Sequence, residues 1–136
     1  MLYENLVSES RPLADRAAAA LLRRARLLLP ADRALVELAI LKHLPAFQIA
    51  HLLGQHPSAV TRRVKKLVRR LQSPLVINLI DNGRRQLPDD LWQIGIERFV
   101  QHRTLNELAD THRVSLYRVR AMIDQVRGWG KAPQRW

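Results

Sequence analysis

Two stretches of this chain share one spacing of small and apolar residues. The first is PAFQIAHLLGQHPSAVTRRVKKLVRRL, residues 45–71, and the second is TLNELADTHRVSLYRVRAMIDQVRGW, residues 104–129. When Ala50 is aligned with Ala109, each alanine is followed ten positions later by a valine, Val60 or Val119. A small residue, a short polar break and a later apolar stripe are typical of two helices that cross so closely that only a methyl group fits between them.

This spacing predicts a helix-turn-helix in each stretch. We therefore expect an all-α fold with two helix-turn-helix, three-helix units in tandem and an extra helix near the amino terminus. Residues 1–72 are expected to hold the extra helix and the first unit, residues 73–88 a short helix and a linker, and residues 89–136 the second unit and a basic tail. A chain of 136 residues has room for one compact domain or two very small ones.

Prolines, glycines and capping residues set the expected helix ends. Gly54 is placed to turn the chain at positive φ. Ser73 and Ser115 are expected N-caps, and Thr104 with Glu107 three residues later forms the pattern of a capping box. The expected helices are residues 12–29, 31–43, 46–53, 57–72, 74–82, 89–101, 104–111 and 115–127.

Three segments are not assigned to the main helices. One of them is compatible with either a helix or a strand, and the other two are expected to be a linker and a tail. Residues 73–83 contain enough β-branched side chains to leave a strand open as the alternative to a helix. The segment GRRQLP, 83–88, is the expected linker between the units. The segment GWGKAPQRW, 128–136, is expected to be a mobile tail.

The charge of the chain points to a polyanionic partner. The net charge is +11, which is extreme for a globular protein and favours nucleic acid first and an anionic membrane surface second. Residues 54–72 contain six basic residues and no acid, and residues 103–136 contain seven basic and three acidic residues. Basic runs are also typical of solvated helix faces, but these two basic segments contain the second helices of the two repeats.

The second stretch resembles region 4 of the sigma-70 family of transcription initiation factors, the part that reads the upstream promoter element. The first stretch is similar through Ile49-Ala50, Leu53-Gly54 and Val60, followed by a dense basic end. The resemblance implies a bacterial, sequence-specific DNA-binding regulator of transcription; a complete sigma factor would need further regions for which 136 residues leave no room. The matching residues of the second stretch are Thr104-Leu105, Glu107-Leu108-Ala109, Val114-Ser115, Arg118-Val119-Arg120 and Met122.

In a helix-turn-helix the second helix enters the major groove with its first turns toward the base edges. Arg62 is the strongest candidate for a bidentate hydrogen bond to guanine, because its planar guanidinium matches the two acceptor atoms of the guanine edge. If five or six phosphates are neutralised, the logarithm of affinity falls with that of salt at a slope of about −5. The base-edge candidates of the first unit are Ser58, Thr61, Arg62 and Lys65, and its phosphate candidates are Arg63, Lys66, Arg69 and Arg70.

The second unit has its own candidates and one open alternative. Leu116 and Tyr117 stand where polar base-reading residues are expected, so they contact thymine methyl groups or form a surface for another protein. Its base-edge candidates are Ser115, Tyr117, Arg118 and Ala121, and its phosphate candidates are Arg113 and Arg120.

Other chemistries are not expected. The chain has no cysteine, its five histidines do not follow a metal-ligand spacing, and no catalytic or phosphate-loop motif occurs, so no enzyme activity, metal or cofactor is predicted. No apolar run approaches the roughly 18–20 residues that span a bilayer, and MLYENLVSES lacks the features of a secretory signal. We expect a cytoplasmic, nucleoid-associated protein with double-stranded DNA as its partner and no membrane.

Two further partners stay open. In the first alternative, one unit binds RNA polymerase or another regulator while the other unit binds DNA. In the second, the chain forms a homodimer on a palindrome, through its amino-terminal helix or through the short helix at 74–82. A basic amphipathic membrane binder is disfavoured, because the apolar residues are distributed as a helical core.

Overall fold

Residues 11–132 are described by a computed structural model, with side chains from Ala14 onward. Every regular element in this range is helical, so the expected all-α class is confirmed for the described part of the chain. The chain forms two compact units with their boundary between Gln72 and Ser73. The expectations for MLYENLVSES and for the last four residues of the tail concern segments outside the described range.

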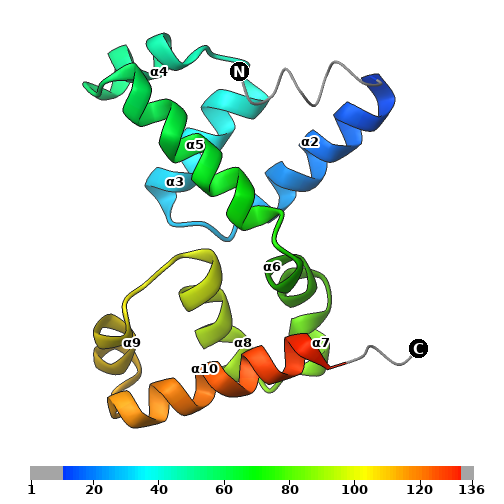
Figure 1. Cartoon of the computed structure of the whole chain (residues 1–136), viewed down its shortest axis with the longest axis vertical. Coiled ribbons are helices and arrows are strands. Elements are labelled where there is room, and N and C mark those ends of the chain that lie inside the picture. Colours follow the sequence, from blue (N-terminus) through cyan, green and yellow to red (C-terminus); the bar gives the residue numbers. More distant parts are fainter. Residues whose placement is uncertain (1–10, 133–136) are drawn as a thin grey trace. The chain divides into compact units, whose positions relative to one another are not determined.

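Unit 1 is built around one long helix. Helix α5 (Pro57–Leu71) contacts α2, α3 and α4, as Figure 1 shows in the upper half of the picture. The side of α5 that faces these helices is apolar and buried, through Val60, Val64, Leu67, Val68 and Leu71. The other elements are α2 (Arg11–Ala25), α3 (Pro30–Val36), its π-helical continuation η1 (Glu37–Leu41) and α4 (Ala46–Leu53).

Unit 2 is also built around its last helix. Helix α10 (Leu116–Lys131) contacts α6, α8 and α9, and buries Val119, Met122, Ile123 and Val126. Ser73, Thr104 and Ser115 accept backbone N–H groups at the starts of their helices, so all three expected N-caps are confirmed. The other elements are α6 (Pro74–Asn78), η2 (Leu79–Gly83), α7 (Arg84–Gln86), α8 (Asp89–Gly95), η3 (Ile96–Val100) and α9 (Leu105–His112).

The two units repeat the same succession of helices at an offset of 59 residues. Helices α3 and α8 begin at residues 30 and 89, α4 and α9 at 46 and 105, and α5 and α10 at 57 and 116. The turns repeat too: the Lys42 N–H donates to the carbonyl of Glu37 at 3.0 Å, as Gln101 does to Ile96 at 3.1 Å. The residues that follow, His43 and His102, both have a positive φ, 55° and 56°. Positions 59 residues apart can therefore be compared directly.

At the start of unit 2 the expected short helix at 74–82 is confirmed, whereas the expected linker is wrong over most of its length. Residues 74–86 are helical throughout, which excludes the strand and removes most of the expected linker at 83–88. Gly83, the first residue of the expected linker, is buried, and a Cβ there would lie 3.0 Å from both Leu79 Cδ1 and Trp92 Cδ1. Gly83 therefore serves close packing, and the Trp92 indole N–H donates to the carbonyl of Leu79 at 3.1 Å.

The expected tail also begins too early. Helix α10 continues through Gly128 and Gly130 to Lys131. Trp129 is half-buried there, and its indole N–H donates to Gln86 Oε1 at 3.1 Å. Packing of the indole offsets the low helix propensity of the two glycines, which had suggested a break.

The turn between the last two helices has a left-handed residue in both units, so substitutions at this residue in each unit test what that conformation contributes to stability. Gly54 has a φ of 65°, as predicted, and Arg113 takes the same left-handed conformation at 55°. A Cβ added to Gly54 would meet nothing within 4 Å, so only its backbone conformation opposes a side chain. We expect Gly54→Ala to lower the free energy of unfolding by about 1 kcal/mol, and Arg113→Gly to raise it by about 0.5–1 kcal/mol. Urea unfolding of the full chain measures both, and a shift of both variants in the same direction would contradict the account.

Candidate nucleic-acid interface

The amino-terminal end of α5 is fixed by local chemistry. His56 accepts the Ser58 N–H at its Nδ1, at 3.2 Å, and Pro57 begins the helix where no N–H is needed. Helix α4 packs across this end through Ile49 and Ala50, which are both buried. Val60 lies beneath that contact and is 0% exposed. The start of α5 is therefore held on one side, and its opposite side faces solvent.

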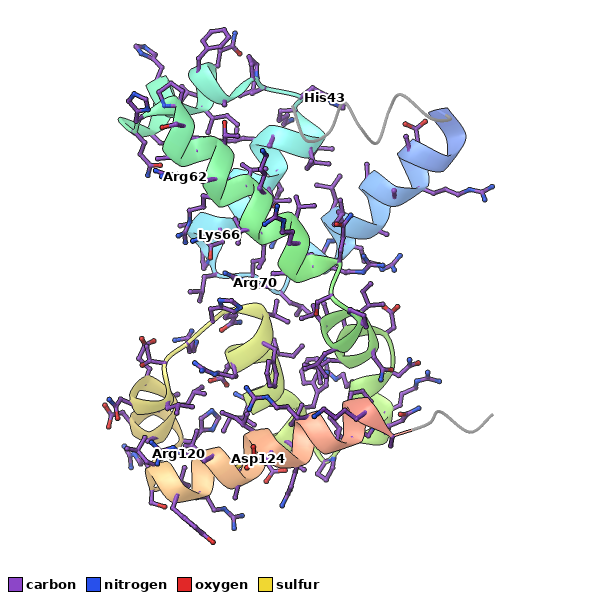
Figure 2. The ribbon with its side chains drawn as sticks, viewed as in Figure 1. His43, Arg62, Lys66, Arg70, Arg120 and Asp124 are labelled. Carbon is purple, nitrogen blue, oxygen red and sulfur yellow. The ribbon has the colours of Figure 1, made fainter. Side chains whose placement is uncertain are left out.

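The solvent side of α5 carries a continuous row of cations. Figure 2 labels Arg62 and Lys66 at successive turns of the helix, and Arg70 one turn farther on, where the side chain is only 13% exposed. Five of the six α5 cations are exposed. We call the four of them that do not interact with Asp32 the basic face of α5: Arg62, Lys65, Lys66 and Arg69. No acidic residue occurs on α5, so this face has a single sign of charge.

The two hydroxyl candidates on the first turns of α5 are exposed but already hydrogen-bonded locally. Ser58 Oγ lies 2.8 Å from His56 Nδ1. Thr61 Oγ1 donates to the carbonyl of Pro57 at 3.1 Å, a bond to the preceding turn of the helix. Each hydroxyl keeps acceptor capacity toward solvent, beside the basic face of α5.

Two of the phosphate candidates interact with the buried carboxylate of Asp32. Arg63 donates to Asp32 Oδ1 from both Nε, at 3.2 Å, and Nη2. Arg70 Nη1 lies 3.9 Å from Asp32 Oδ2, and the Arg70 side chain is only 13% exposed. Burial lowers the pKa of Arg70, the Asp32 carboxylate opposes that effect, and Arg63 adds to it. Arg70 is therefore not placed to contact phosphate. The Arg63 side chain is 58% exposed, but its guanidinium is already hydrogen-bonded to Asp32.

The position of Asp32 in the sequence does not reveal the cluster that it forms. Asp32 lies in the first turn of α3, where an acidic residue is favoured by the helix dipole alone. It is also only 4% exposed and lies against two arginines more than thirty positions away. A buried carboxylate requires a partner, but the sequence does not indicate which of six cations on α5 would turn toward it.

In unit 2 the candidates gather at the amino-terminal end of α10. Ser115 is the N-cap, and its Oγ accepts the Arg118 N–H at 3.1 Å. Tyr117 is 83% exposed, the most exposed of the large apolar side chains among the described residues. Arg118 and Arg120 are exposed on the same helix, Arg113 is exposed in the preceding turn, and Ala121 is half-buried.

Position by position, α10 lacks the basic face of α5. At the four equivalent positions α10 has small, neutral or acidic residues, and Figure 2 labels Asp124 on this helix beside Arg120. The Asp32 cluster is also replaced: Leu91 stands at the place of Asp32, and Met122 at that of Arg63. The pairs on the outer face are Arg62 and Ala121, Lys65 and Asp124, Lys66 and Gln125, and Arg69 and Gly128.

Unit 2 contains a buried polar pair that the sequence pattern did not reveal. His112 Nε2 lies 3.1 Å from both carboxylate oxygens of Glu97, and Glu97 is buried. The equivalent residues of unit 1 are Leu38 and Leu53. The pair joins η3 to the end of α9 and thereby fixes the helix that packs across α10.

Other kinds of site are not found in residues 11–132. No helix in this range is both long and apolar enough to cross a bilayer. No group of three or more His, Asp or Glu side chains in the same range is arranged to hold a metal ion. Comparison of the chain with protein-family models, with curated proteins and with solved structures gives no match.

The Asp32 cluster predicts a large effect on stability. Asp32→Ala removes the carboxylate that Arg63 and Arg70 share, and leaves the half-buried Arg70 guanidinium in a poorly solvated place. We expect the free energy of unfolding to fall by about 3 kcal/mol, measured by urea unfolding. Asp15→Ala, on an exposed position of α2, is the matched control and should change it by less than about 0.5 kcal/mol. Equal effects of the two variants would rule out a structural role for the cluster.

Proposed function

We propose that this protein is a sequence-specific double-stranded DNA-binding regulator of transcription. In this proposal α4 and α5 act as a helix-turn-helix, with α5 as the helix that enters the major groove. The observation that carries the proposal is the basic face of α5, which lies opposite a buried apolar stripe on a helix braced by α4. A single-signed helical face of this kind suits the phosphate-lined groove of a duplex.

The roles of the α5 residues follow from their places along the helix. Arg62 is assigned to a guanine edge, with Ser58, Thr61 and Lys65 near the neighbouring bases. Lys66 and Arg69 lie farther along, where the helix leaves the groove, and are assigned to phosphates. Arg63 and Arg70 are removed from the set of phosphate contacts because of their interactions with Asp32.

Unit 2 acts in the same proposal as a second helix-turn-helix. Its contacts come from Ser115, Tyr117, Arg118 and Ala121 toward the bases, with Arg120 toward phosphate, and Arg113 in the preceding turn also assigned to phosphate. The resemblance to region 4 of sigma-70 factors supports this assignment, since the matching residues include Thr104, Ser115 and Arg118. The proposal places the protein on the bacterial nucleoid.

A second candidate function applies to unit 2 alone. The acidic, amide and glycine residues at 124, 125 and 128 weaken the attraction of α10 for phosphate, and Tyr117 is highly exposed. These features favour a surface that binds RNA polymerase or another regulator while unit 1 binds DNA. Exposed aromatic residues are frequent anchors of protein interfaces.

Substitutions on α5 test the leading proposal. Once selection from random duplexes has given a preferred sequence, Arg62→Ala should weaken binding to it about 5- to 150-fold and change the base preference at one position. Arg69→Ala should weaken binding to all duplexes about equally and reduce the salt slope by about 0.9. Fluorescence anisotropy over a range of salt concentrations measures both effects.

The control for these variants is Arg16→Ala, which removes one exposed positive charge from α2. It should leave the base preference unchanged and alter the salt slope less than Arg69→Ala does. If the sequence preference survives in both Arg62→Ala and Arg118→Ala, the assigned base contacts are wrong. If selection returns no preferred sequence, the proposal of sequence-specific binding fails.

The role of unit 2 is tested by making α10 resemble α5. Asp124→Lys with Gln125→Lys introduces the residues that α5 carries at the equivalent positions, Lys65 and Lys66. If α10 lies against DNA, affinity rises and the salt slope becomes steeper by about 0.9 for each phosphate newly neutralised. We expect this gain. Unchanged binding would remove α10 from the DNA interface and favour the protein-binding candidate.

A further inference from the structure

A depression with basic and aromatic walls lies on unit 2, away from the amino-terminal end of α10. It has a volume of about 260 Å³ and is lined by Arg98, Phe99, His102 and Arg127. These residues come from η3, from the turn that follows it and from the carboxyl-terminal half of α10. None of the residues assigned to DNA contacts lines it.

Both arginines of this depression are oriented by neighbours. Arg98 Nη1 donates to the carbonyl of Arg103 at 2.8 Å, which leaves other N–H donors of the guanidinium for a ligand. The Arg127 guanidinium carbon lies 5.4 Å from the centre of the Phe99 ring, within cation–π distance. Asp124 Oδ1 lies 3.9 Å from Arg127 Nη1, and its side chain is 76% exposed, so it screens this charge weakly.

Unit 1 shows that the fold does not require these side chains. The equivalent positions are occupied by Ala39, Ile40 and Val68, all buried in the core of unit 1. Only the histidine is common to both units, and His43 and His102 share a left-handed backbone. The same scaffold thus carries an apolar core at these positions in unit 1, and two arginines beside an aromatic ring in unit 2.

The geometry points to an anion site that binds a phosphate group. Two guanidinium groups with fixed planes suit the several oxygens of a phosphate, since arginine binds such groups with paired N–H donors. None of the four lining residues is acidic, and the Phe99 ring offers an apolar wall to the part of the ligand that carries the phosphate. The ligand is a phosphodiester of a nucleic-acid backbone or a small organic phosphate. The site does not depend on the proposed function.

Titration of the full chain with inorganic phosphate tests the site. The readout is the NMR signals of the arginine side-chain Nε–Hε groups at constant ionic strength. We expect saturable shifts of the Arg98 and Arg127 signals. Arg127→Val and Arg98→Ala place there the residues of unit 1 (Val68 and Ala39), and each should weaken phosphate binding at least about tenfold, the effect of losing a charge-assisted hydrogen bond.

Two controls separate this site from general attraction to a basic protein. Lys131→Gln removes one exposed charge from the same helix outside the depression, and should change the phosphate affinity less than twofold. Arg127→Lys keeps the charge but loses the paired donors, and should weaken binding less than Arg127→Val. It also serves as the test if the valine variant does not fold. Weakening by Lys131→Gln equal to that by the arginine variants, or no saturable shift, would overturn the proposal.

The source of the phosphate is decided with duplex DNA. If the ligand is a backbone phosphodiester, Arg127→Val lowers the salt slope of DNA binding by about 0.9, and DNA shifts the same arginine signals. If the ligand is a small organic phosphate, DNA affinity is unchanged, and adenosine 5′-monophosphate displaces no DNA but shifts those signals. Either result supports the anion site. Absence of a saturable shift with inorganic phosphate contradicts it, whichever result DNA gives.

Discussion

The close crossing of α4 over the start of α5 determines what this surface of unit 1 presents. Ala50 and Ile49 are buried where the two helices pack together, and Val60 is fully buried beneath them. Because one side of α5 is held in this way, the four cations of its basic face lie on the opposite, exposed side. A bulkier residue at Ala50 would separate the helices and change which residues of α5 face solvent. Ala109, which is half-buried, and Val119, which is fully buried, occupy the same positions in unit 2, where α9 packs against α10.

The repeated scaffold separates what the fold requires from what it only permits. Helix lengths, the left-handed turns and the apolar stripe of the last helix recur in both units. Charge does not recur. Asp32 with its two arginines is replaced by Leu91, Met122 and Trp129, and the basic face of α5 by neutral or acidic residues. Since either set of side chains is compatible with the helices, the cations on α5 are not explained by folding. This agrees with the proposal that the basic face of α5 binds a polyanion.

Much of the fold could be predicted from short-range patterns. The N-caps at Ser73, Thr104 and Ser115 and the positive φ of Gly54 are fixed by backbone geometry that a few residues determine. The errors arose where distant contacts dominate. The sequence pattern predicts a linker that starts at Gly83, but this residue lies in a helical segment where Leu79 and Trp92 approach closely. Of the candidate phosphate contacts on α5, Lys66 and Arg69 are exposed, whereas Arg63 and Arg70 interact with Asp32, which helical periodicity alone cannot indicate.

The Asp32 cluster also affects how the basic face of α5 acts on a polyanion. Two of the six cations on α5 face a buried carboxylate, so they act inside unit 1 and contribute less to the field outside. The remaining four lie on one exposed side, where their attraction for an anion is weakened by salt within about 10 Å at 0.1 M ionic strength. Binding through this face should therefore be strongly salt-dependent, while the interaction of Asp32 with the mostly buried Arg70 is screened less by salt. Helix α5 therefore contributes both to the stability of unit 1, through the two arginines that contact Asp32, and to a salt-sensitive surface, through the four cations of its basic face.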